Sequence, residues 1–352
     1  MTIQISELAD YGWSNFFTSQ LDADDLETCI PARVKSVHRN QIHVIGVDLD
    51  RMTMPYISKD GDGAQATVGD WLLLEPETFR PKRLLDRKSI FKRKAVGSHR
   101  GEQLIAANVD TLFIVASCNF DFNLARLERY MSLAHEAQVT PVIILTKADL
   151  VDDPDEFAKA VSGLHPSLIV ETMDARDATA AKRLEPWCGL GQTVAFVGSS
   201  GVGKSTLINT LIGTDDIETR DVRVDDSKGR HTTTGRTLHR LPEGGWLIDT
   251  PGMREIQLTD VEEGIKEVFS DILEMAVSCK FNDCKHNQEP GCAVRVAIED
   301  GSLDAERLKR WQKLAAEEVR NTETLAQRHS RDRSFGKMVK RAKKDKAHWQ
   351  DD

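Results

Sequence analysis

Residues 198 to 205 read Gly-Ser-Ser-Gly-Val-Gly-Lys-Ser and fit the phosphate-binding pattern G-x-x-x-x-G-K-[ST]. An apolar run, Val194–Val197, precedes them, and Thr206–Leu211 follows with helical spacing. The glycines let successive N–H groups point at a phosphate, and the start of the helix adds positive potential. The predicted phosphate and Mg²⁺ contacts are Gly198, Ser199, Ser200, Gly201, Val202, Gly203, Lys204, Ser205 and Thr206. The alternative, a flexible Gly/Ser turn, would not require a strand pattern before it and a helix pattern after it.

A phosphate loop does not specify the base, and the candidate base reader lies upstream of it. Thr146, Lys147, Ala148 and Asp149 directly follow the buried-strand pattern Val142–Leu145. A carboxylate at a strand end can accept hydrogen bonds from guanine N1–H and from the 2-amino group together, and adenine offers no such pair of donors.

Downstream of the loop, Asp249-Thr250-Pro251-Gly252 has the form of a Mg²⁺ and γ-phosphate sensor, with Asp249 and Gly252 as its key residues. The order of base reader, phosphate loop and sensor predicts a circularly permuted GTPase domain.

The segment Lys228–Thr234 carries three threonines and is a candidate switch, because a Thr can join the Mg²⁺ shell when a γ-phosphate is present. We select Thr233, although the spacing does not distinguish it from its neighbours. Met253 stands where Ras-like GTPases have a water-orienting Gln, so slow intrinsic hydrolysis is expected. His231, His239 or a partner could supply the missing group.

A cluster of thiols and one imidazole predicts a metal site near the C-terminus. Three thiolates and one imidazole form a closed, four-coordinate zinc site, which is structural because no position is left for water. Unrelated loop cysteines are the alternative reading. The expected ligands, at the spacing Cys-x4-Cys-x-His-x5-Cys, are Cys279, Cys284, His286 and Cys292.

The chain has 352 residues and a net charge of −9, which indicates several domains and argues on average against nucleic-acid binding. Its basic residues, however, concentrate in two stretches, 80–94 and 328–346, which could contact phosphates. A charged linker and a solubilising tail are the alternatives. The first ten residues do not resemble a signal peptide, and no apolar run approaches the roughly 18 residues of a membrane span. We expect a cytoplasmic protein without membrane contact.

The elements that must position these residues form four predicted regions. Short alternating runs such as Ala32–Val37, Gln41–Ile45 and Gly69–Leu74 suggest a small β-barrel of the oligonucleotide-binding (OB) type. From residue 111 strands alternate with helices, which predicts a mostly parallel sheet with phosphates at the carboxyl ends of its strands. The expected regions are an N-terminal arm (1–31), an OB-type β-barrel (32–98), an α/β permuted P-loop GTPase domain (99–262) and a mostly helical zinc-binding domain with a basic tail (263–352).

The chain resembles the ribosome small-subunit-dependent GTPase A family (RsgA, YjeQ or YloQ) in three combined features. These are the permuted motif order, the barrel before the GTPase domain and the Cys/His site after it. The resemblance covers residues 32 to 300. It implies a GTPase with Mg²⁺ and one structural Zn²⁺ that converts GTP to GDP and acts on the small (30S) ribosomal subunit and its rRNA late in maturation. It also implies guanine contacts at Thr146, Lys147 and Asp149. Members of the family usually have a Ser-Ala element that backs the guanine. The corresponding residues here are Asp174 and Ala175, so the resemblance implies this contact for Ala175.

Three functions remain open at this stage, and a monomer is expected for each. The first is a ribosome-stimulated GTPase. The second is a P-loop GTPase of another regulatory pathway, with a small substrate or a membrane target. The third is a nucleic-acid-binding module whose nucleotide site is only structural; the complete set Lys204, Ser205 and Asp249 argues against it. The rRNA site, maturation step, nucleotide affinities and any paralogue with the same role do not follow from the sequence.

Overall fold

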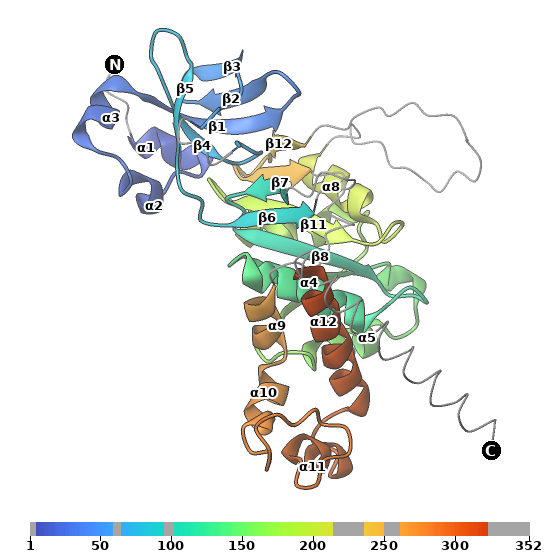
Figure 1. Ribbon diagram of the computed structural model, residues 1–352. Coiled ribbons are helices and arrows are strands. Elements are labelled where there is room, and N and C mark those ends of the chain that lie inside the picture. Colours follow the sequence, from blue (N-terminus) through green and yellow to red (C-terminus); the bar gives the residue numbers. More distant parts are fainter. Residues whose placement is uncertain (1–4, 59–64, 95–101, 214–235, 250–260, 323–352) are drawn as a thin grey trace, which may run out of the picture.

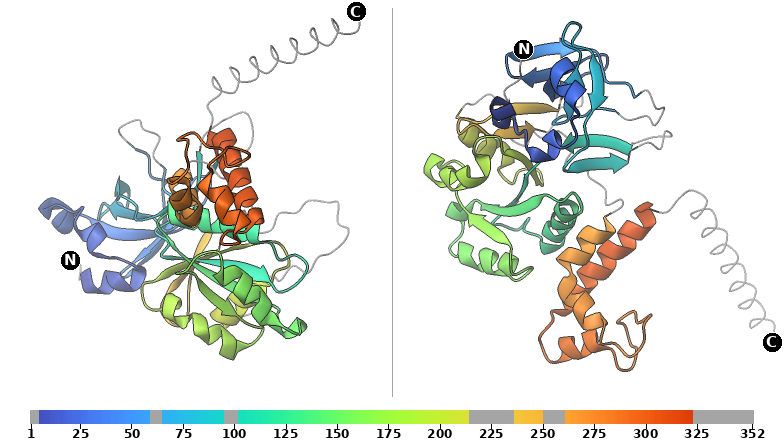
Figure 2. Two further views of the ribbon diagram at one scale, coloured as in Figure 1. Left: turned by 90° about the horizontal axis from the view of Figure 1, so that it is seen from below. Right: turned by 90° about the vertical axis from the view of Figure 1, so that its left-hand side faces the viewer.

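A computed structural model describes residues 5–58, 65–94, 102–213, 236–249 and 261–322. Short helices and antiparallel strands from the N-terminus lie at one end of the molecule, and a parallel sheet with helices lies in the middle (Figure 1). An arm of helices from the C-terminal part extends from the opposite side of the sheet, and the second views agree (Figure 2).

The central sheet has the strand order β10-β9-β8-β11-β13, with all neighbours parallel. Its strands are rich in apolar residues because both faces are covered. Helices α4 and α5 cover one face, and α6, α7 and α8 cover the other. The strands are β8 (Thr111–Ser117), β9 (Thr140–Thr146), β10 (Ile169–Thr172), β11 (Thr193–Gly198) and β13 (Trp246–Asp249). The helices are α4 (Leu124–Glu136), α5 (Pro154–Ser162), α6 (Ala178–Ala181), α7 (Glu185–Cys188) and α8 (Lys204–Ile212).

The N-terminal strands continue this sheet instead of forming a separate one. Strand β12 pairs antiparallel with β13, and β1 joins β12 through the pair Ser36 and Thr237. Strand β1 also pairs with β2 and β4, so eleven of the described strands form one mixed sheet. The added strands are β1 (Ile30–Val37), β2 (Ile42–Gly46), β3 (Leu49–Thr53), β4 (Trp71–Leu74), β5 (Pro81–Leu84) and β12 (Thr237–Arg240). Within the described residues β3 and β5 do not pair, so the expected closed barrel is not seen.

Short helices precede β1 in the region predicted as the N-terminal arm: α1 (Ile5–Leu8), η1 (Ala9–Tyr11), α2 (Asn15–Thr18) and α3 (Ala23–Thr28). Arg33 on β1 fastens this arm to the sheet, because its guanidinium donates to the carbonyl of Tyr11 (2.6 Å) and to Thr193 Oγ1 (2.8 Å). The side chain is fully buried, and that burial lowers its pKa to about 10. One arginine thus joins the N-terminal arm, the first strand and the strand that leads into the phosphate loop.

Much of the basic stretch 80–94 is folded into the molecule. It contributes β5 and β6 (Ile90–Lys94), and β6 pairs with β7 (Glu102–Ala107). Arg87 makes an ion pair with the buried Asp70 at 2.7 Å, and Lys88 contacts Asp110 at 3.0 Å. These two cations have internal partners, so they are less available for an external phosphate than the sequence suggests.

The C-terminal helices attach to the sheet through α4. Helices α9 (Glu262–Val268) and α12 (Ala305–Thr322) pack beside it, and α10 (Ser270–Ala276) and α11 (Ala293–Glu299) lie farther out (Figure 1). Glu128 of α4 is buried and accepts from Arg307 (3.1 Å) and Arg310 (2.8 Å) of α12. Arg307 also pairs with Asp271 of α10. Among the described residues, no helix is both long and apolar enough to cross a bilayer.

Candidate functional site

The phosphate loop leaves the carboxyl end of β11 and leads into the N-terminus of α8. Gly198 has φ +149°, and a Cβ there would lie 2.2 Å from the carbonyl oxygen of Val115 on β8. Only glycine fits such a close approach. Gly203, at φ +94°, occupies the N-cap position of α8. The ammonium of Lys204 donates to the carbonyls of Gly198 (2.7 Å) and Ser199, so it lies over the loop.

The remaining loop residues differ in exposure. Ser200 and Gly201 are exposed, Ser205 and Thr206 are half-buried, and Val202 is buried in the core beneath the loop.

The proposed base-reading segments meet this loop directly. Thr146, at the end of β9, is fully buried, and its hydroxyl lies within hydrogen-bonding distance of the carbonyls of Ala116 (3.1 Å) and Val202. The carbonyl of Ala175, after β10, accepts from Thr210 Oγ1 on α8 at 2.8 Å. Segments far apart in the sequence thus converge at the carboxyl edge of the sheet, where nucleotides bind in this class of fold.

Asp149 lies in a single 3-10 turn, Ala148–Leu150, directly after β9. Lys147 precedes it with φ +58°, a left-handed conformation that turns the chain across the strand end. The Asp149 carboxylate is partly exposed and accepts from Arg176 Nη2 at 2.7 Å. Arg176 also donates to Asp174, the residue that departs from the Ser-Ala element. Arg176 was not predicted as a site residue. Its position directly after Asp174-Ala175 is the one sequence feature that could have indicated it.

Arg126 is a second residue that the sequence interpretation missed. It lies in the first turn of α4, pairs with Asp121 at 2.9 Å and donates to Ser199 Oγ of the phosphate loop. No spacing pattern in the sequence marks this arginine. It links the phosphate loop to the helix that carries the C-terminal arm.

The sensor side is described only in part. Asp249 ends β13, the parallel neighbour of β11, and is half-buried. His239, on the adjacent β12, has a pKa lowered by burial, which the nearby Asp249 partly offsets. Thr233, Gly252, Met253 and His231 lie outside the described residues.

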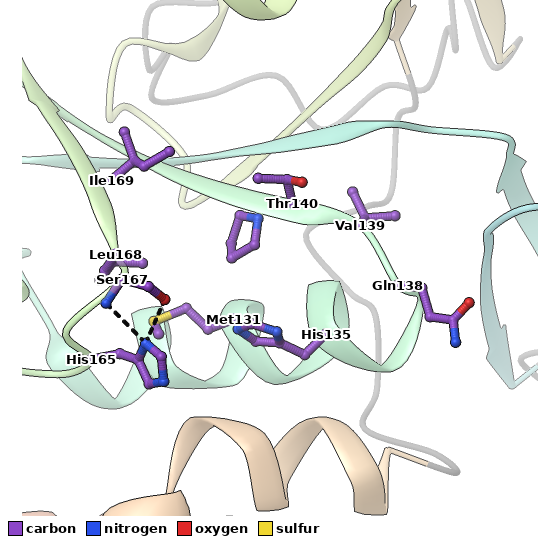
Figure 3. Close-up of a pocket in the computed structure, with 10 residues that line it drawn as sticks. Met131, His135, Gln138, Val139, Thr140, His165, Ser167, Leu168 and Ile169 are labelled. Carbon is purple, nitrogen blue, oxygen red and sulfur yellow. Dashed lines mark hydrogen bonds between the residues drawn. The ribbon is translucent and has the colours of Figure 1, made fainter.

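A cavity of about 320 Å³ lies elsewhere, at the amino ends of β9 and β10 (Figure 3). Met131, His135, His165 and Thr140 are among its lining residues. The backbone N–H of Ser167 donates to Nδ1 of His165. The phosphate loop is at the carboxyl edge of the sheet, so this cavity is not the nucleotide site.

The four predicted metal ligands come together before and at the start of α11. Their ligand atoms all lie within 4.8 Å of one another. The sulfurs of Cys279 and Cys292 are 3.8 Å apart, and His286 Nδ1 lies 3.7 Å from the first and 3.4 Å from the second. Tetrahedral zinc with Zn–S bonds of about 2.3 Å would separate two sulfurs by about 3.8 Å. The cluster, which includes Cys284, therefore fits a four-coordinate zinc ion.

The backbone near Cys279 favours its thiolate form, whereas burial raises the pKa of Cys284 to about 11. Burial would raise the pKa of Cys279, but the amides of Val294 and Ala293 in the first turn of α11 lower it overall. His286 at φ +60° and Gly291 at φ +77° make the tight turns that bring the ligands together.

Comparisons with known proteins agree with this geometry. The family model RsgA GTPase matches residues 84–259. The chain is 52% identical to the small ribosomal subunit biogenesis GTPase RsgA 2 of Vibrio parahaemolyticus, over 96% of this chain and 93% of that protein. It is 50% identical to the small ribosomal subunit biogenesis GTPase RsgA of Mesorhizobium japonicum, over 92% of this chain and 93% of that protein.

Two solved structures have a similar fold. The match to YjeQ from Thermotoga maritima covers 81% of this chain and 97% of that chain, with a TM-score of 0.60 and 22% identity. The match to YloQ, described as a circularly permuted GTPase, covers 84% of this chain and 97% of that chain, with a TM-score of 0.60 and 23% identity. The predicted permuted order of the GTPase fold is confirmed. The chain belongs to the RsgA GTPase family.

Proposed function

We propose that the protein hydrolyses GTP to GDP and phosphate, is stimulated by the small ribosomal subunit, and acts through rRNA in late maturation of that subunit. The observation that carries the proposal is the convergence of the phosphate loop with Thr146 and Ala175 at one edge of the sheet. The names of relatives at 50% and 52% identity support the ribosomal role. We infer that the protein works in the cytoplasm, as a monomer.

The phosphate-loop residues carry the hydrolytic chemistry in this proposal. Lys204 would exchange its loop carbonyls for the β- and γ-phosphates, and the N-terminus of α8 would stabilise the same charge. Ser205 and Asp249 would hold Mg²⁺, which neutralises charge that develops on the phosphates. Thr233 and Gly252 are proposed from the sequence pattern to sense the γ-phosphate. Met253 cannot orient water, so the isolated protein should be slow.

Cys279, Cys284, His286 and Cys292 are proposed to bind one structural Zn²⁺. The separations of their ligand atoms support this assignment. With three sulfurs and one nitrogen the set is complete, so the ion would stabilise the loop between α10 and α11 without binding substrate.

Two surfaces are proposed to contact RNA. The first is the N-terminal strand region, which we interpret as an OB-type barrel; its β1-β2-β3 meander and the β1–β4 and β4–β5 pairs support this interpretation. The second is the basic segment 328–346, which lies outside the described residues. Both would act mainly through phosphates, so binding should weaken as salt rises.

The test is GTP turnover by the purified protein alone, with small subunits and with large subunits, at low and raised salt. Small subunits should increase the rate at least tenfold, large subunits should have little effect, and the stimulation should decline as salt rises. Lys204→Ala with small subunits is the control for GTPases that co-purify with ribosomes. Turnover unchanged by small subunits at low salt would contradict the ribosomal role and favour a different regulatory pathway.

A further inference from the structure

Asp149 and Asp174 are two carboxylates on adjacent strand ends with one arginine between them. They follow β9 and β10, which are parallel neighbours. Arg176 Nη2 lies 2.7 Å from Asp149 Oδ2 and 2.9 Å from Asp174 Oδ2. A single nitrogen with two hydrogens therefore bridges both carboxylates. The hydrogen bonds from Arg176 also lower the pKa of Asp174.

The two ends of this bridge differ in strength. Asp174 accepts from Arg176 three times, from Nε (3.0 Å), from Nη2 (2.9 Å) and from its backbone N–H (2.9 Å). Asp149 accepts one bond from Nη2. Arg176 is thus anchored on Asp174 and reaches across to Asp149. Ala175, between Asp174 and Arg176 in the sequence, accepts a hydrogen bond from Thr210 of α8. This contact sets the position of the Arg176 bridge relative to the phosphate loop.

We propose that Arg176 is a positioning residue for guanine recognition: it neutralises Asp174 and holds the Asp149 carboxylate in the orientation that the base requires. The inference rests on the proposed role of Asp149 as base reader. A carboxylate has about four acceptor positions on two oxygens. Arg176 occupies one of them, so it can stay in place while both oxygens accept from N1–H and the 2-amino group. Without Arg176, two like charges would face each other, and Asp149 would turn away from Asp174.

The test compares binding of GTP with binding of inosine triphosphate, which lacks the 2-amino group and so makes one contact fewer to Asp149. Arg176→Ala should lower GTP affinity by about three- to tenfold, a modest effect because the side chain is 67% exposed. Affinity for inosine triphosphate should fall less, so the preference for GTP should shrink. A loss of general structure would lower both affinities equally.

Asp174→Ser in the Arg176→Ala background should restore most of the preference, because it removes the repelling charge and Ser still supports the turn. Arg183→Ala is the matched control: Arg183 lies nearby, is 48% exposed and pairs with Glu171, and its loss should leave both affinities unchanged. An unchanged preference in Arg176→Ala, or an equal loss for both nucleotides that Asp174→Ser does not rescue, would overturn the proposal.

Asp149→Asn separates this inference from the proposed function. If Asp149→Asn leaves GTP affinity unchanged, Asp149 is not the base reader, and both assignments fail. If Asp149→Asn weakens GTP binding and improves binding of xanthosine triphosphate, while Arg176→Ala has no effect on the preference, only the role of Arg176 is refuted.

Discussion

Replacing Arg307 with Met tests the buried ion cluster that attaches α12 to α4. The Arg307 side chain is 7% exposed and donates to Glu128 (3.1 Å), to Asp271 (2.7 and 2.9 Å) and to the carbonyl of Val268 (2.9 Å). Met keeps an aliphatic chain but has no donor. The loss falls mainly on Glu128, which is 1% exposed, because Asp271 is 40% exposed and can be hydrated.

Removing one partner from a buried ion pair costs about 3 to 5 kcal/mol. Glu128 retains Arg310 at 2.8 Å, so we take the lower end, about 3 kcal/mol. For a cooperative unit of about 150 to 250 residues, each kcal/mol shifts the unfolding midpoint by about 2 to 4 °C. The expected decrease in Tm for Arg307→Met is therefore about 6 to 12 °C.

Calorimetric unfolding of Arg307→Met beside Lys309→Met measures this difference. Lys309 lies on the same helix, is 67% exposed and pairs with the exposed Glu306, so its replacement should change stability by less than about 0.5 kcal/mol. If the two variants unfold within about 2 °C of each other, the cluster adds no net stability, and apolar packing alone holds α12 on α4.

Three further outcomes follow from the site. Lys204→Ala should abolish most hydrolysis in a single-turnover assay, because its charge stabilises the transition state more than bound GTP; near-normal rates would contradict the loop assignment. Elemental analysis should find one zinc per chain, and Cys284→Ser should eliminate it and unfold residues 275–295 while GTP still binds; full zinc content in that variant would show that Cys284 is not a ligand. Gly198→Ala should weaken GTP binding at least tenfold through its clash with Val115, whereas Gly189→Ala, which has no atom within 4 Å and no left-handed φ, should not; equal affinities would contradict the close approach.

The elements of the nucleotide site were predictable because their signals are local. Val142–Leu145 and Val194–Val197 are continuous apolar runs that end in polar or glycine-rich segments, and the structure extends them only to β9 and β11. Because parallel strands in this fold are buried on both faces, their sequences stay apolar throughout. The cluster of Cys279, Cys284, His286 and Cys292 was predictable for a similar reason, since these residue types at short spacing limit the chemistry.

Contacts between distant residues were not predictable in this way. Arg126 reaches Ser199 and Arg176 reaches Asp149 only after strands have paired, and a single charged residue carries no periodic signal. Two cations of the basic stretch 80–94 show the same limit. Its charges suggested an external phosphate, while Asp70 and Asp110, distant from Arg87 and Lys88 along the chain, satisfy two of them.

The continuous sheet also constrains how the chain can fold during its own synthesis. Ser36 of β1 pairs with Thr237 of β12, so the end of β1 near Ser36 lacks its second neighbour until most of the chain has been translated. Strand β11 lies between β8 and β13, and β13 is the last of these three to be made. Pairings of such sequence separation form slowly and leave edges that invite wrong partners. The phosphate loop therefore acquires its full strand support only after β13 has been made, and high-affinity GTP binding should begin only in chains that extend past residue 249.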